Sequence, residues 1–285
     1  MKTTAILTAS LFISLSFSAT ANSHRHHFAK NNATDYPIST LLREHPCQRL
    51  NAPTDSLWGS QVSTYAWKAF FQDNSNAYIV NALNRLQCKE VFVSPGDDQS
   101  PKVQDFLQMA SSANISVARL LGENSYVETD HGFPNLEAKM LSFKNAGFTA
   151  IHLDIEPHIL ADYKQNIDLY TERFNTLILL SSQWCAQEGI ELSISIPMHT
   201  QPSTAALLAL LQIKSYIMAY ENPNMLSLLN RTTTLRNTLQ GLYVWVVRAK
   251  DFTDLAHLQS AIAVLNQNGV YELGIYDIKE MDVRY

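Results

Sequence analysis

The chain has 285 residues, of which 46% are hydrophobic and 16% are charged, and its formal net charge is −5 at pH 7. This length suits one large domain, and α/β barrels commonly reach it as a single unit. No block of lysine and arginine is present, so nucleic acid and anionic membrane surfaces are poor candidate partners. The cysteines Cys47, Cys88 and Cys185 are too few and too scattered for a disulfide scaffold or a zinc site. One pair could form a disulfide, and the sequence does not choose which.

The first residues have the pattern of a secretory signal peptide. Lys2 gives a positive start, residues 5–17 form an apolar run, and Ala19-Thr20-Ala21 is a small-residue cleavage pattern. The run is too short for a membrane span, and no later stretch is long enough to be one. We therefore expect a signal peptide at 1–21, a polar N-terminal extension at 22–57, and a secreted or periplasmic protein.

From residue 58 to residue 285, short apolar strands alternate with amphipathic helices. Glycines precede several of these strands, where a glycine ends a helix. This alternation of strands and helices predicts a single (β/α)8 TIM barrel of the α/β class. The alternative, an open doubly wound sheet, usually carries a glycine-rich phosphate loop after its first strand, and none is found here, so we expect no cofactor. The expected strands are 64–70, 90–94, 116–121, 150–156, 191–196, 215–220, 242–247 and 272–276.

The expected strand 150–156 carries the most informative pattern. Side chains on a strand alternate between two faces, so one face here is apolar and the other carries an imidazole and two carboxylates. Pro157 cannot donate to a sheet ladder and ends the strand. Functional groups of a barrel collect at the C-terminal ends of its strands, so this strand end is the candidate site. The two faces are Ile151, Leu153 and Ile155, against His152, Asp154 and Glu156.

Asp154 and Glu156 point the same way, two residues apart. Close carboxylates repel each other, so one of them holds its proton to higher pH. This favours Glu156 as a general acid beside an ionised Asp154. The alternative is a structural polar cluster held by arginine or lysine inside the barrel.

Further polar and aromatic residues lie at the ends of the other expected strands. Aromatic faces pack against sugar rings, and carboxylates bond hydroxyl groups or move protons, so this mixture is typical of a carbohydrate site. For Trp67 and Trp245 the sequence does not fix which face of the strand is inward. The expected substrate-binding residues are Trp67, His152, His199, Met218, Glu221, Trp245 and Tyr276, with Tyr220 as a catalytic candidate.

Two motifs resemble family 18 of the glycoside hydrolases, the chitinase-like barrels. Asp154-Ile155-Glu156 is similar to the end of that family's strand-four motif Asp-x-x-Asp-x-Asp-x-Glu, and 217–221 (Ile-Met-Ala-Tyr-Glu) resembles its strand-six Met-x-Tyr-Asp. Gly274-Ile275-Tyr276-Asp277 is similar in outline to the strand-eight end, with tyrosine in place of the substrate-stacking tryptophan. The chain departs from the motifs at Thr149 and His152, which occupy the two earlier aspartate positions, and at Glu221.

The resemblance implies a role for three residues. Asp154 would orient the acetamido group of the substrate, which attacks its own anomeric carbon. Glu156 would protonate the leaving oxygen, and the hydroxyl of Tyr220 would hold the acetamido carbonyl. A protonated His152 would hold Asp154 ionised. The function expected is that of an exported glycoside hydrolase-like protein acting on a polysaccharide or N-acetylated glycan.

Two other functions remain open on the sequence. The first is a non-catalytic carbohydrate-binding barrel that keeps the cleft, which the missing aspartate at His152 favours. The second is a metal-dependent hydrolase, although no helical His-x-x-x-His pair is present and we expect no metal. Its ligands would be His152, Asp154, Glu156, His158 and His199.

Overall fold

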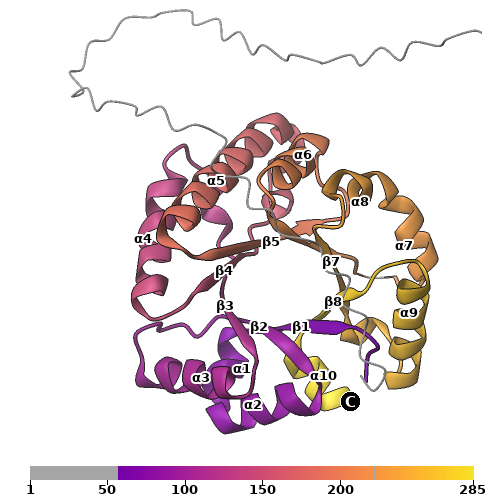
Figure 1. Cartoon of the computed structure of the whole chain (residues 1–285). Coiled ribbons are helices and arrows are strands. Elements are labelled where there is room, and N and C mark those ends of the chain that lie inside the picture. The colour runs from indigo at the N-terminus through magenta and orange to yellow at the C-terminus, as the bar shows by residue number, and fades with distance from the viewer. Residues whose placement is uncertain (1–56, 221) are drawn as a thin grey trace, which may run out of the picture. The chain divides into compact units, whose positions relative to one another are not determined.

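A computed structural model describes residues 57–220 and 222–285. The expected signal peptide, the extension as far as residue 56, Cys47 and Glu221 lie outside the described residues. Eight parallel strands pair in sequence order and close into a barrel (Figure 1), which confirms the predicted (β/α)8 fold. The strands are β1 (Gln61–Ala66), β2 (Cys88–Val93), β3 (Ser116–Leu121), β4 (Ala150–Leu153), β5 (Glu191–Pro197), β6 (Lys214–Met218), β7 (Tyr243–Arg248) and β8 (Glu272–Tyr276).

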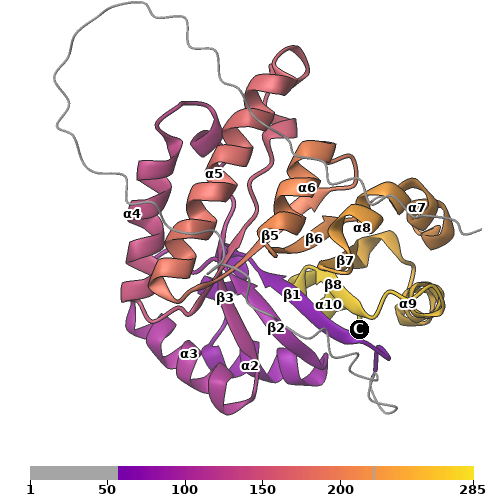
Figure 2. The ribbon, with the colours of Figure 1, turned by 45° about the horizontal axis from the view of Figure 1, so that its top comes forward.

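Helices form a ring around the strands, as the tilted view in Figure 2 also shows. The helix α5 is the longest of those described and ends at Gly189, whose φ of +68° is the left-handed conformation that glycine adopts without strain. The helices are α1 (Lys68–Asp73), α2 (Asn76–Arg85), α3 (Pro101–Ser112), α4 (Gly132–Asn145), α5 (Ile167–Glu188), α6 (Pro202–Leu210), α7 (Met225–Arg231), α8 (Thr233–Leu239), α9 (Leu255–Gln267) and α10 (Ile278–Arg284). Short 3-10 turns are η2 (Asn124–Val127), η3 (Pro157–Ile159), η4 (Tyr163–Gln165) and η5 (Ala249–Asp251).

Two strand boundaries differ from the prediction in a way that affects the site. The run 64–70 was expected to be one strand, but β1 ends at Ala66 and α1 starts at Lys68. Trp67 is the N-cap of that helix, with φ −70° and ψ 161°, so its backbone is still extended. The strand β4 ends at Leu153 instead of Glu156, and the backbone from Asp154 to Glu156 continues past the sheet.

Alternate side chains of each strand point into the barrel or out toward the helices. The inner set forms its own cluster, and the outer set belongs to the larger core between sheet and helices. At the start of the strands the interior is polar: the Tyr216 hydroxyl donates to Glu90 Oε2 at 2.5 Å, and Lys214 Nζ lies 2.7 Å from Glu272 Oε2. The members of the inner cluster are Tyr65, Phe92, Ala118, Leu120, Tyr216, Val244 and Val246.

Cys88 and Cys185 are both buried and are not bonded to each other. Burial raises the pKa of each thiol to about 12, which leaves them uncharged and unreactive at neutral pH. None of the helices within 57–220 and 222–285 is long and apolar enough to cross a membrane.

Candidate functional site

The two carboxylates lie just beyond the C-terminal end of β4 and are held there by backbone hydrogen bonds. The Asp154 N–H donates to the Leu121 carbonyl at 2.7 Å, which extends the pairing with β3 by one residue. The Glu156 N–H donates to Asn124 Oδ1 at 2.6 Å. Asp154 is 8% exposed, whereas the Glu156 side chain is 28% exposed. Both carboxylates therefore occupy the face where barrel enzymes bind substrate, with Glu156 nearer to solvent.

The two carboxyl groups lie in different surroundings and therefore have different pKa values. Burial raises the pKa of Asp154 to about 6, although a hydrogen bond from Ser195 opposes the shift. Burial, and then the charge of Asp154, raise the pKa of Glu156 to about 7. A carboxyl group that keeps its proton near neutral pH is what general acid catalysis needs. Of the two groups, Glu156 holds its proton to higher pH.

His152 lies below Asp154 in the interior of the barrel and is 0% exposed. Its ring stacks on Phe92 at 3.9 Å between centroids and meets the edge of Tyr216 at 4.8 Å. Burial, and then the charge of Lys214, lower its pKa to about 3, so the ring is neutral at physiological pH. The expectation that a protonated His152 holds Asp154 ionised is therefore wrong. The expectation that His152 contacts substrate is also wrong, because the ring is enclosed.

Both nitrogens of His152 are engaged by serines of β5. Nδ1 lies 2.8 Å from Ser193 Oγ, and Nε2 lies 2.9 Å from Ser195 Oγ. Ser195 Oγ also lies 3.4 Å from the Tyr65 hydroxyl, and hydrogen bonding from Ser195 is the cause that lowers the pKa of Asp154. A neutral imidazole donates from one nitrogen and accepts at the other, so His152 donates to one of these serines and accepts from the other.

The result is a chain of hydrogen bonds that runs from Ser193 through His152 to Ser195, next to Asp154. Chains of this kind polarise one another and hold each member in place. We call it the serine–histidine chain. The sequence prediction missed both serines, although their alternation with Ile194 and Ile196 on β5 marked them as facing the same side as His152.

Three aromatic side chains cover the inner mouth of the barrel, and we call them the aromatic floor: Trp67, Tyr220 and Tyr276. The ring of Tyr276 lies 6.1 Å from that of Trp67 and 5.6 Å from that of Tyr220. Burial raises the pKa of both tyrosines, and the charges of Asp154 and Glu156 contribute to the rise. A β-carbon added at Gly122 would lie 3.7 Å from Trp67 Cη2 and 3.3 Å from the Asp154 carbonyl oxygen. The aromatic floor therefore lies beside the carboxylates.

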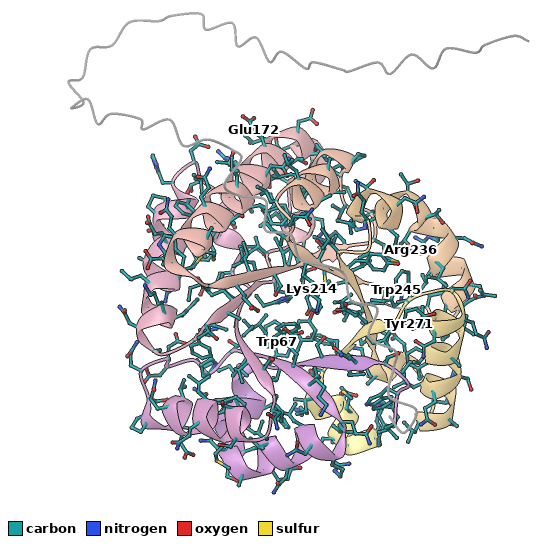
Figure 3. The ribbon with its side chains drawn as sticks, in the orientation of Figure 1. Trp67, Glu172, Lys214, Arg236, Trp245 and Tyr271 are labelled. Carbon is teal, nitrogen blue, oxygen red and sulfur yellow. The ribbon has the colours of Figure 1, made fainter. Side chains whose placement is uncertain are left out.

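The other predicted site residues lie in different places. Trp245 is on the outer face of β7, 0% exposed in the core between sheet and helices, so its expected contact with substrate is wrong (Figure 3). Met218 is buried on β6 at the mouth. The His199 ring lies 5.1 Å from that of His158, whose Nε2 lies 3.4 Å from Glu156 Oε2. His158, named above only as a possible metal ligand, thus touches the proposed acid.

The described residues offer no obvious metal centre. Within 57–220 and 222–285, no group of three or more His, Cys, Asp or Glu side chains is arranged to hold a metal ion. His152, one of the ligands of the metal-dependent alternative, has both ring nitrogens committed to serines. The residues at the end of β4 therefore fit acid–base chemistry better than metal ligation.

The fold and the site together define a (β/α)8 barrel with carboxylates at the C-terminal end of β4. No family model matches the sequence, and no curated protein matches it. Among solved structures, the chain is similar to the spore cortex-lytic enzyme SleL of Bacillus megaterium QM B1551, with a TM-score of 0.57 and 9% identity over 77% of this chain and 70% of that one. It is also similar to the PgaB (BpsB) glycoside hydrolase domain of Bordetella bronchiseptica, with a TM-score of 0.50 and 12% identity over 78% of this chain and 95% of that one. At these identities the likeness establishes the fold alone, which is a (β/α)8 barrel.

Proposed function

We propose that the protein is an exported glycosidase that acts on an N-acetylated glycan. The observation that carries the proposal is Glu156, a partly exposed carboxyl group with a pKa raised to about 7, next to Asp154 and the aromatic floor. Aromatic faces bind the C–H surfaces of sugar rings, and a proton held near neutral pH can be given to a glycosidic oxygen. Export rests on the signal-peptide pattern of residues 1–21.

The proposed mechanism assigns Asp154 to the substrate acetamido group and Glu156 to the leaving oxygen. Asp154 Oδ1 is buried and has no hydrogen-bond partner among the described residues, so it is free to accept from an acetamido N–H. The acetamido oxygen then attacks the anomeric carbon while Glu156 transfers its proton, and the glycosidic C–O bond breaks. Water later opens the cyclic intermediate with Glu156 as base, so the anomeric configuration is retained.

Hydrolysis of a panel of fluorogenic N-acetylglucosaminides and bacterial glycans tests the proposal, with Glu156→Gln as the control. We expect turnover by the unmutated protein and a loss of about a hundredfold or more in Glu156→Gln, which keeps the shape and removes the acid. Turnover that survives the substitution would overturn the assignment. Absence of turnover in both proteins, with glycan binding in both, would indicate the non-catalytic binding barrel instead.

A further inference from the structure

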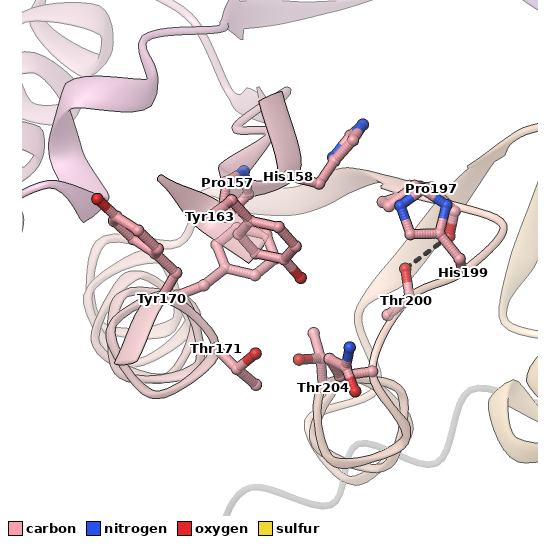
Figure 4. A pocket seen from close by; sticks show the side chains of 11 residues that line it. Pro157, His158, Tyr163, Tyr170, Thr171, Pro197, His199, Thr200 and Thr204 are labelled. Carbon is pink, nitrogen blue, oxygen red and sulfur yellow. Dashed lines mark hydrogen bonds between the residues drawn. The ribbon is translucent and has the colours of Figure 1, made fainter. Parts of the chain in front are cut away.

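His158 follows Glu156 by two residues in the chain, and the two side chains meet just past the end of β4. His158 Nε2 lies 3.4 Å from Glu156 Oε2, and the two side chains are similarly placed, 22% and 28% exposed. On its other side, the His158 ring meets the edge of the His199 ring at 5.1 Å between centroids (Figure 4). His158 has no part in the proposed mechanism, although it touches the group that must hold and release a proton.

The backbone between the two residues fixes this contact. The turn η3 begins at Pro157, a buried residue whose ring fixes its own φ. The N–H of Ile159 donates to the Glu156 carbonyl at 3.2 Å. The N–H of Leu160 donates to the Pro157 carbonyl at 3.1 Å. Because Asn124 also holds the Glu156 N–H, a rigid turn keeps the carboxyl group and the imidazole side by side.

The two ring nitrogens of His158 have different surroundings. Nδ1 is buried and has no hydrogen-bond partner within the part of the chain that the structure describes, whereas Nε2 faces the carboxyl group. A proton on Nδ1 would leave a buried donor unpaired, and a proton on Nε2 gives the ionised carboxylate a donor. The proton of the neutral ring therefore lies on Nε2 and faces Glu156 Oε2.

His158 acts on Glu156 as a neutral donor and not as a cation. Burial, and then the charge of His199, lower the pKa of His158 from its ordinary value. At 3.4 Å the two atoms are farther apart than in a formed N–H···O bond of about 2.7–3.2 Å. Catalytic hydrogen bonds are often long before substrate binds, and bonds to a charged acceptor are short. The contact should therefore tighten as Glu156 loses its proton.

The other groups that face Glu156 do not stabilise its charge. Asp154 lies beside it, and its negative charge disfavours a second carboxylate. Tyr220 and Tyr276 of the aromatic floor also feel the charge of Glu156, and burial raises the pKa of both, so they are uncharged at neutral pH. The Nε2–H of His158 is thus well placed to favour the ionised form of the acid.

We propose that His158 is a positioning residue for Glu156: its Nε2–H holds the orientation of the carboxyl group and stabilises the carboxylate that remains after proton transfer. Negative charge develops on Glu156 in the transition state, so the hydrogen bond is stronger there than in the ground state and raises kcat more than it changes KM. This inference rests on the proposed function and adds to it a residue that acts through the acid.

The test compares two amides at position 158. In His158→Gln the amide reaches the place of Nε2, whereas in His158→Asn it reaches only the place of Nδ1, away from Glu156. His158→Ala removes the ring without adding a donor, and His131→Asn, at an exposed position before α4, is the matched control. Carbon-13 NMR gives the pKa of Glu156 in each protein, with the signal assigned by its loss in Glu156→Gln. Thermal unfolding checks that each variant is folded.

We expect the pKa of Glu156 to rise by about one unit in His158→Asn and His158→Ala, because the carboxylate loses a donor. On a fluorogenic N-acetylglucosaminide, kcat should fall about tenfold in these two variants while KM changes less than about threefold. The decline of kcat/KM should also move to higher pH. His158→Gln and His131→Asn should keep the native pKa and kcat.

Three results would overturn the inference or its basis. If His158→Asn keeps the native pKa and kcat, the positioning role fails and the proposed function stands. If His158→Gln is impaired as much as His158→Asn, the ring matters for its shape and not for its donor, and the inference is wrong. Absence of turnover in every form, with the pKa shift still present, would overturn the proposed function and with it the part of His158 in catalysis.

Discussion

His152 Nε2 and Ser195 Oγ lie 2.9 Å apart inside the barrel and form a hydrogen bond. The ring is neutral because burial lowers its pKa to about 3. In the family 18 motif that β4 resembles, an aspartate stands at the position of His152. This protein therefore has a neutral hydrogen-bond chain beside Asp154, where that motif has a second carboxylate. The neutral ring and its serine partners lead to two predictions.

Ser195→Ala should raise the pKa of Asp154, because the Ser195 hydrogen bond lowers it in the native protein. It should also lower the free energy of unfolding by about 1–3 kcal/mol, since His152 Nε2 loses its partner. Carbon-13 NMR of the Asp154 carboxyl group measures the first effect. Ser193→Ala is the matched control: it removes the partner of Nδ1 at a similar cost in stability but does not touch Asp154. An equal pKa shift in both variants would show that Ser195 has no specific effect on Asp154.

The imidazole signals of His152 should not move between pH 5 and pH 8. The ring is enclosed by Phe92 and Tyr216, and its pKa of about 3 lies below this range. Proton NMR of the histidine ring protons measures this, and the signals are assigned by their loss in His152→Phe. A titration midpoint between pH 5 and pH 8 would show that the ring takes up a proton, and would restore the idea of a charged support for Asp154.

Hydrolysis should decline above about pH 7. Glu156 must carry a proton to act as the acid, and its pKa is raised to about 7, so kcat/KM should fall about tenfold for each pH unit above that value. The pH dependence of kcat/KM on a fluorogenic substrate measures the decline. A constant rate from pH 6 to pH 9 would mean that the proton comes from another group.

Glu156→Gln should stabilise the protein at pH 8 but not at pH 4. The pKa of Glu156 is raised from 4.5 to about 7 on folding, so the folded state holds this proton more tightly than the unfolded chain. Stability is therefore lost as the pH rises from 4.5 to about 7, and glutamine has no such loss. We expect a gain of about 1–3 kcal/mol at pH 8 in denaturant unfolding. Glu137→Gln, at an exposed position on α4, should show no such pH-dependent gain.

Tyr276→Ala should weaken glycan binding about tenfold, because it removes the central ring of the aromatic floor. Trp245→Phe should reduce stability and leave binding unchanged, since Trp245 is enclosed on the outer side of β7. Calorimetric titration of N-acetylchitopentaose into each variant compares the two. Equal losses of affinity would mean that the outer core, and not the barrel mouth, controls the site.

Some residues of the site could be placed from the sequence pattern alone, and others could not. Asp154 and Glu156 could be placed from the sequence because alternation along β4 continues past the end of the strand. The sequence could not show which of Trp67 and Trp245 faces the barrel mouth. Each lies in an apolar run, in which the inward and outward positions of the strand have the same character. His152 was recognised as a polar residue on the inner face, but its charge and exposure depend on Phe92, Tyr216 and Lys214, which come from other strands.

The sequence by itself determined the periodicity: short strands, intervening helices, and a strand end that carries two carboxylates. These features are local, since they depend on side-chain spacing and backbone preference within a few residues. Only the tertiary structure decided the protonation states and the hydrogen bonds between the β5 serines and His152. Each of these arises from groups far apart in the chain, because desolvation and hydrogen bonding depend on which side chains the closed barrel brings into contact.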